Sequence, residues 1–353
     1  MNRPIYRHEC EKNYPHGSDV LERDVSDNGF SRGWGMHFKP VPDYFFDAHI
    51  HYKGPREHIF NEAMRGDAEM GNAIGLRRAL VFLQIYGKKW NYDMITDSVM
   101  DQFPYFTAAE IRKLSGGESG GRFVWAAYMN YLSSEPELVH AAADAGIRCI
   151  KLHNTPIIEN NLPPDFWFGA EWRDTFNALA ERNIPVNFHA VQRLSASPYS
   201  GGGRNSYWSG GWKNGTAYTN EDLLQAFLTL CRRYPKINWI GAHQLHLGWE
   251  RLDELFTGYP NLYIDTSCGC ILRLYDDFYD HDREYIREIF IRNADRILFG
   301  TDTFWGDAGR TPHTREMTLQ HMRFITALNL PEDVLNKICH INAERLLKLD
   351  PLP

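Results

Sequence analysis

The chain has 353 residues, of which 43% are hydrophobic and 14% aromatic, so it can bury a large core and is not disordered in composition. Its formal net charge is -7, with lysine and arginine scattered along the chain. This balance argues against a nucleic acid or an anionic membrane surface as a partner.

The first 43 residues are polar and carry turn signals at 15–18 and 27–29, so we expect an N-terminal extension packed on a main domain that spans residues 44–353. The start of the chain lacks a continuous apolar stretch, and no segment approaches membrane-spanning length. The six cysteines are dispersed, which favours reduced thiols and a cytoplasmic location.

From Tyr44 onward, apolar runs rich in β-branched residues alternate with amphipathic stretches of helical length, as in repeated β-α units around a parallel sheet. Eight such runs predict strands, at residues 44–49, 78–85, 122–128, 147–152, 184–188, 237–242, 262–265 and 296–300. Because eight strands close a (β/α)8 barrel, we predict an α/β fold of the TIM-barrel type.

Local signals place several helices between these strands. Proline in a first turn and glycine at the end delimit a helix within 135–146, and an Asn cap begins another at 220–233. Helices starting near Pro331 and Asn342 are expected to close the C-terminus. The glycine-rich segment 192–219 leaves a strand, so it lies on the face where barrel active sites are built, and we predict that it forms a lid.

Polar side chains stand at the C-terminal tips of several predicted strands. His49 and His51 are two residues apart on the first strand, so both project from the same face. The fifth, sixth and eighth strands run into His189, His243 and Asp302, respectively. In a closed barrel these tips surround one mouth. Imidazole and carboxylate are the ligands of a catalytic zinc-type ion, so the pattern predicts a metal site.

Seven short motifs follow one another along the chain: Asp47 to His51, Gly146 to His153, Pro185 to His189, Gly241 to His243, Tyr259 to Ser267, Leu298 to Asp302 and Asn342 to Leu347. This ordered set resembles the amidohydrolase superfamily, and within it the amidohydrolase-related (amidohydrolase 2) branch, which includes aminocarboxymuconate-semialdehyde decarboxylase-like proteins. The resemblance implies that one divalent ion, zinc ahead of manganese or iron, is bound by His49, His51, His189 and Asp302. It also implies that His243 contacts the reacting group or its water.

Neighbouring residues have roles that follow from these positions. Asp302 can accept the proton of a metal-activated water and His243 can donate or accept one, so both are candidate catalytic residues. Asp47 shares the parity of the two first-strand histidines and is expected to accept a hydrogen bond from one of their rings. Lys151 and His153 share a face of the fourth strand. They could hold a second metal ion, with Lys151 carboxylated as in binuclear superfamily members, or bind a substrate oxygen; the branch is usually mononuclear, which favours one ion.

Residues after other strand ends are candidates for binding the substrate. Arginine suits a carboxylate because it makes bidentate hydrogen bonds, and aromatic side chains suit an apolar or ring portion. The candidates are Tyr86, Tyr128, Arg193, Arg204, Arg273 and Trp305.

Two reactions fit this pattern, and the fold alone cannot choose between them. The leading hypothesis is hydrolysis of a C-O or C-N bond, in a lactone or an amide, by metal-activated water. The second is non-oxidative decarboxylation of an aromatic or enoic acid. A non-catalytic barrel that serves as a binding module is disfavoured because every expected ligand position is filled. The expected partners are a small, carboxylate-bearing substrate and further copies of the chain, in a dimer or larger homo-oligomer.

Overall fold

The computed structural model describes residues 42–52, 54, 59, 71–85, 105–115, 121–129, 136–154, 162–191, 218, 220–247, 249–267, 277–306 and 311–352. The predicted N-terminal extension and the predicted lid fall almost wholly outside these residues, so both stay predictions. Within the described ranges, no helix has the length and apolar character needed to cross a membrane.

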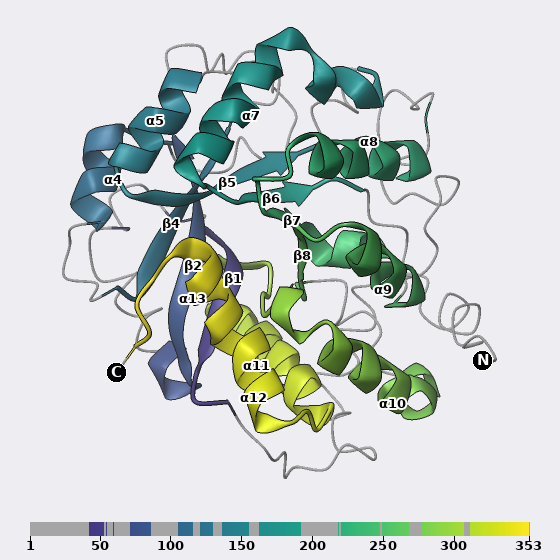
Figure 1. Ribbon diagram of the computed structural model, residues 1–353. Helices are drawn as coiled ribbons and strands as arrows, with labels where there is room; N and C mark the ends of the chain where they lie inside the picture. The colour runs from purple at the N-terminus through teal and green to yellow at the C-terminus, as the bar shows by residue number, and fades with distance from the viewer. Residues whose placement is uncertain are drawn as a thin grey trace.

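The strands form one parallel sheet, in which strands that lie next to each other in the barrel also follow one another along the chain (Figure 1). Each predicted strand has a counterpart, because continuous apolar runs are typical of parallel strands buried on both faces. The strands are β1 (Phe45–Tyr52), β2 (Leu76–Ile85), β4 (Phe123–Tyr128), β5 (Ile147–His153), β6 (Val186–His189), β7 (Trp239–Gly241), β8 (Leu262–Asp265), β9 (Ile297–Leu298) and β10 (Thr303–Trp305), with a short β3 (Tyr105–Phe106) beside β2.

The last barrel strand is broken into β9, which pairs with β8, and β10, which pairs with β1. Between them, the Ala48 amide donates to the Phe299 carbonyl (2.8 Å) and the Asp302 amide donates to the His49 carbonyl (2.8 Å). This one segment therefore joins both edges of the sheet. The predicted (β/α)8 TIM barrel is confirmed, and the break falls at Asp302, whose φ of 62° is left-handed.

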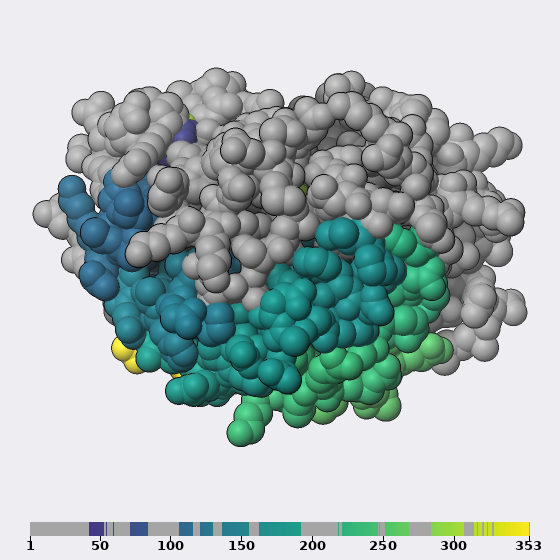
Figure 2. Space-filling model, turned by 90° about the horizontal axis from the view of Figure 1, so that it is seen from above, coloured from purple at the N-terminus to yellow at the C-terminus, as the bar shows by residue number. Residues whose placement is uncertain are grey.

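Helices lie outside the strands (Figure 1). The predicted helices within 135–146 and at 220–233 are confirmed as α5 and α8, and the C-terminal pair as α12 and α13. In Figure 2 the described surface passes from blue through teal to green in chain order, as expected for successive β-α units side by side. The helices are α4 (Ala108–Ser115), α5 (Pro136–Asp144), α7 (Ala170–Arg182), α8 (Asn220–Arg233), α9 (Trp249–Gly258), α10 (Asp277–Arg292), α11 (Thr311–Ala327), α12 (Glu332–Asn336) and α13 (Asn342–Leu347), with a π-helical turn at Lys337–Ile341.

Strand alternation decides which side chains reach the inside of the barrel, and β6 illustrates it. Phe188 points to the helix layer, where its ring centroid lies 5.3 Å from Trp167 and 5.7 Å from Phe227 of α8. Its two neighbours, Asn187 and His189, therefore face the opposite side. Burial of the aromatic face holds the strand in a register that sends both polar side chains inward.

A buried ion pair ties the start of β2 to the C-terminal helices. The Arg78 guanidinium lies 2.5 Å from Glu344 Oε1 on α13, and it also donates to the Asp350 carbonyl (2.9 Å). Tyr44 Oη donates to the same carboxylate, and the His340 ring stacks on Tyr44 at 4.1 Å. Glu344 and Arg78 are both buried, so each depends on the other to offset its lost hydration.

Replacing Arg78 with alanine is expected to lower the free energy of unfolding by about 3–5 kcal/mol, because it leaves the Glu344 carboxylate buried without its cation. Urea denaturation followed by circular dichroism measures this loss. Arg173→Ala is the matched control, since Arg173 is exposed on α7 and should change stability by about 0.5 kcal/mol or less. Equal effects of the two changes would show that the ion pair does not stabilise the fold.

Candidate metal centre

His49 and His51 project together from the C-terminal part of β1, as their spacing predicts. Their Nε2 atoms lie 3.2 Å apart, and Asp302 Oδ1 lies 3.3 Å from the first and 3.0 Å from the second. Burial lowers the pKa of His51 to about 4. Burial alone would raise the pKa of Asp302, but the two histidines keep it below its usual range. A neutral His51 beside an ionised Asp302 has the protonation states that metal binding requires.

A left-handed turn after β7 places His243. His243, Gln244 and Leu245 have φ values of 57°, 52° and 55°, a conformation that costs roughly 1–2 kcal/mol for each non-glycine residue. The buried Leu245 side chain folds back against Gly241, where an added Cβ would lie 2.6 Å from Leu245 Cδ2. Gly241 therefore permits the turn, and Gln244 Nε2 fastens it by donating to the carbonyls of Asp265 (3.0 Å) and Ser267 (3.2 Å).

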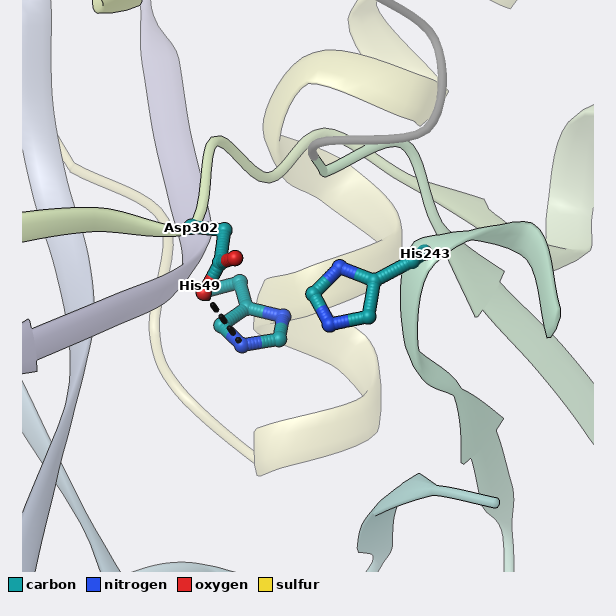
Figure 3. A group of neighbouring side chains, drawn as sticks. All are labelled: His49, His243 and Asp302. Carbon is teal, nitrogen blue, oxygen red and sulfur yellow. Dashed lines mark ion pairs between the residues drawn. The ribbon is translucent and has the colours of Figure 1, made fainter. Parts of the chain in front are cut away.

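The turn brings His243 toward β1, so that His49, His243 and Asp302 face one another (Figure 3). Each offers one ligand atom, and these three atoms lie within 4.8 Å of one another. His49 and Asp302 are donors that suit one divalent metal ion, and His243 lies close enough to contact a group bound to that ion. The other two predicted ligands adjoin the group: His51 contacts His49 and Asp302, and His189 Nδ1 lies 3.2 Å from His243 Nε2.

Asp265, at the end of β8, connects these residues, and the sequence reasoning assigned it no role. Its Oδ2 accepts from His49 Nδ1 (2.8 Å) and Asn187 Nδ2 (2.9 Å). Its Oδ1 accepts from the His243 amide (2.9 Å) and from Ser267 Oγ (2.5 Å). Its position in the sequence could have identified Asp265 as a site residue, because it ends an apolar strand, as Asp302 and the histidines do.

Asp47 does not have the role predicted for it. Its carboxylate accepts from the His49 amide (3.0 Å), the Thr301 amide (3.0 Å) and Thr301 Oγ1 (2.5 Å), whereas the ring of His49 donates to Asp265. Burial raises the pKa of Asp47 to about 7. Asp47 thus accepts hydrogen bonds from the backbone amide of His49 and from that of Thr301, which precedes Asp302. The expectation that Asp47 accepts from a histidine ring was wrong, because Asp265 on β8 takes that position.

Lys151 and His153 both lie at this end of the barrel. Lys151 Nζ donates to Asn187 Oδ1 (2.6 Å) and lies 3.2 Å from His49 Nε2, while the His153 ring lies 4.0 Å from that of His189. Burial lowers the pKa of Lys151 to about 8, with the carboxylates nearby opposing the shift. The amine is therefore largely protonated at neutral pH.

The predicted substrate-binding residues divide into three groups. Tyr128 reaches the centre, where its Oη lies 2.7 Å from His51 Nδ1. Trp305 is buried and its ring lies 5.9 Å from that of Phe123, whereas its neighbour Phe304 stacks on His51 at 5.5 Å. The role of Trp305 stays a prediction, and Phe304 lies beside His51 together with Tyr128 and Phe82. The remaining candidates lie outside the described residues: Tyr86, Arg193, Arg204 and Arg273.

Comparison with known protein families gives a match to the amidohydrolase model over residues 46–349. The chain belongs to this amidohydrolase family. The match spans the barrel and the residues of the metal centre, so the resemblance drawn from the sequence motifs is confirmed. No match was found among curated proteins.

Solved structures with the same fold include amidohydrolase-type enzymes of different reactions. One is a 5-carboxyvanillate decarboxylase from Novosphingobium aromaticivorans, complexed with manganese and 4-hydroxy-3-methoxy-5-nitrobenzoic acid (TM-score 0.54, 12% identity, 87% of this chain and 96% of that chain). Another is a 5-carboxyvanillate decarboxylase from Sphingomonas paucimobilis (0.52, 13%, 87% and 100%). A third is a probable 2-pyrone-4,6-dicarboxylic acid hydrolase from Acinetobacter baumannii (0.50, 10%, 86% and 99%). At these identities the likeness shows the TIM-barrel fold.

Proposed function

We propose that this amidohydrolase is a metal-dependent hydrolase of a C-O or C-N bond in a small, carboxylate-bearing substrate of the lactone or amide class. The observation that carries the proposal is the convergence of His49, His243 and Asp302, whose ligand atoms lie within 4.8 Å of one another. A divalent ion bound there would lower the pKa of a water from about 15.7 to near 7 and polarise the carbonyl of the substrate.

The chain's own residues supply the proton transfers for this reaction. Asp302 is ionised and its side chain is 24% exposed, so it can accept a proton from a water in the mouth of the barrel. His243 faces the same space and can protonate the leaving group. The protonated Lys151 adds a positive charge at the same end of the barrel, which suits a substrate carboxylate.

Decarboxylation of an aromatic acid is the second candidate, and the rings around His51 favour it. Phe304 and Tyr128 lie nearly parallel to the His51 ring, at 5.5 and 5.8 Å, and Phe82 approaches at 5.4 Å. Such rings suit the planar face of an aromatic substrate. Two solved relatives of the same fold act as 5-carboxyvanillate decarboxylases.

Product analysis in oxygen-18 water separates the two reactions. Zinc- or manganese-loaded protein is incubated with panels of lactones, amides and aromatic acids, and the products are identified by mass spectrometry. Hydrolysis predicts one solvent oxygen in the product of a lactone or amide, and chelation followed by metal addition should abolish and then restore it. Carbon dioxide release from an aromatic acid, without oxygen-18 in the organic product, would replace hydrolysis with decarboxylation.

A further inference from the structure

Asp265 accepts hydrogen bonds at both of its carboxylate oxygens. Donors already occupy both carboxylate oxygens, including the backbone amides of His243 (2.9 Å) and Ser267 (3.2 Å). An oxygen that accepts from two backbone amides, which can only donate, is also the acceptor of a further hydrogen bond from a hydroxyl.

The direction of the Ser267 hydroxyl follows from this. Ser267 Oγ lies 2.5 Å from Asp265 Oδ1, and because that oxygen already accepts from two backbone amides, the hydroxyl donates its single proton there. The same oxygen lies 2.8 Å from His243 Nδ1. With its proton already used, Ser267 Oγ can only accept from that nitrogen, so the proton of the neutral His243 ring sits on Nδ1.

The ring of His49 is set in the same way by the other carboxylate oxygen. His49 Nδ1 donates to Asp265 Oδ2 (2.8 Å), the oxygen that also accepts from Asn187 Nδ2 (2.9 Å). One carboxylate thus places both ring protons at the back of the site.

We propose that Ser267 and Asp265 act as a positioning pair that fixes His243 in the Nδ1-protonated tautomer and leaves its Nε2 lone pair on the side of His189, whose Nδ1 lies 3.2 Å away. Asp265 orients His243 through the Ser267 hydroxyl and orients His49 directly. The catalytic consequence rests on the proposed function: with Nε2 unprotonated, His243 can take a proton during turnover and return it to the leaving group.

Ser267→Ala tests the pair, because it removes the acceptor of the Nδ1 proton with little change in volume. We expect kcat to fall about 10- to 100-fold with KM and metal content close to those of the wild type. Nitrogen-15 NMR of histidine-labelled, zinc-loaded protein gives a readout that needs no substrate. The wild type should show His243 protonated on Nδ1, assigned with His243→Gln, and Ser267→Ala should lose that protected N-H signal.

Thr318→Val is the matched control, because it removes a buried hydroxyl that donates to the Thr314 carbonyl within α11. It should leave the His243 signals and kcat unchanged. A wild-type His243 protonated on Nε2, or an unchanged N-H signal in Ser267→Ala, would overturn the positioning pair. If the zinc-loaded wild type turns over no substrate, the proposed function fails, and the NMR result still decides the tautomer.

Discussion

Replacing Asp302 with asparagine is expected to lower kcat/KM by about 10³-fold or more while the barrel stays folded. Asparagine keeps the volume and tolerates the left-handed φ of 62°, so the backbone bond to the His49 carbonyl should survive. The change removes the negative charge that contacts both His49 and His51 and the group that accepts the proton. Steady-state kinetics measures the loss, and circular dichroism confirms the fold.

Asp333→Asn is the control for this change, since Asp333 is exposed on α12. It should have wild-type kinetics and stability. An Asp302→Asn protein that keeps more than about a tenth of the wild-type kcat/KM would show that this carboxylate is neither the proton acceptor nor an essential ligand.

Replacing Asp265 with asparagine is expected to weaken metal binding by about 10- to 100-fold, because the acceptor that orients His49 becomes partly a donor. Asparagine offers one oxygen where Asp265 accepts from groups at both oxygens, so its amide must face a donor such as Asn187 Nδ2 or the His243 amide. Each buried group left unsatisfied costs about 1–3 kcal/mol, so stability should fall as well. Competition with a chromophoric chelator measures the affinity.

Asp253→Asn provides a matched comparison, since Asp253 also accepts several hydrogen bonds, from Arg292 and Asn293, but lies on α9, outside the barrel. It should bind metal with wild-type affinity. Unchanged metal affinity in Asp265→Asn would mean that His49 is oriented by other groups, and the connecting role of Asp265 would be lost.

The barrel could be predicted from sequence because its strands are continuous apolar runs that end in polar residues. The run before His189 defines its strand through local chemistry alone. The break in the last strand could not be predicted, because the left-handed Asp302 depends on bonds from Thr301 to Asp47 and from Asp302 to His49 on β1. Such long-range contacts are not visible in a local pattern.

The site was predictable to the same extent. Spacing placed His49 and His51 on one face, and strand ends placed His243 and Asp302 near them. Which carboxylate accepts the hydrogen bond from the His49 ring depends on how β8 faces β1 across the barrel. The two-residue alternation along β1 therefore predicted Asp47, whereas the acceptor is Asp265. The left-handed turn at His243 likewise depends on Gly241 and on Gln244, whose side-chain bonds reach β8.

Metal analysis of the purified chain tests the central claim most directly. Protein expressed with zinc and manganese and purified without chelators is analysed by inductively coupled plasma mass spectrometry. The wild type is predicted to contain about one divalent ion per chain, and a His49→Ala/His51→Ala protein, folded by circular dichroism, about a tenth or less. A wild type that binds no ion, or a double variant that still binds one, would contradict a metal centre at these histidines.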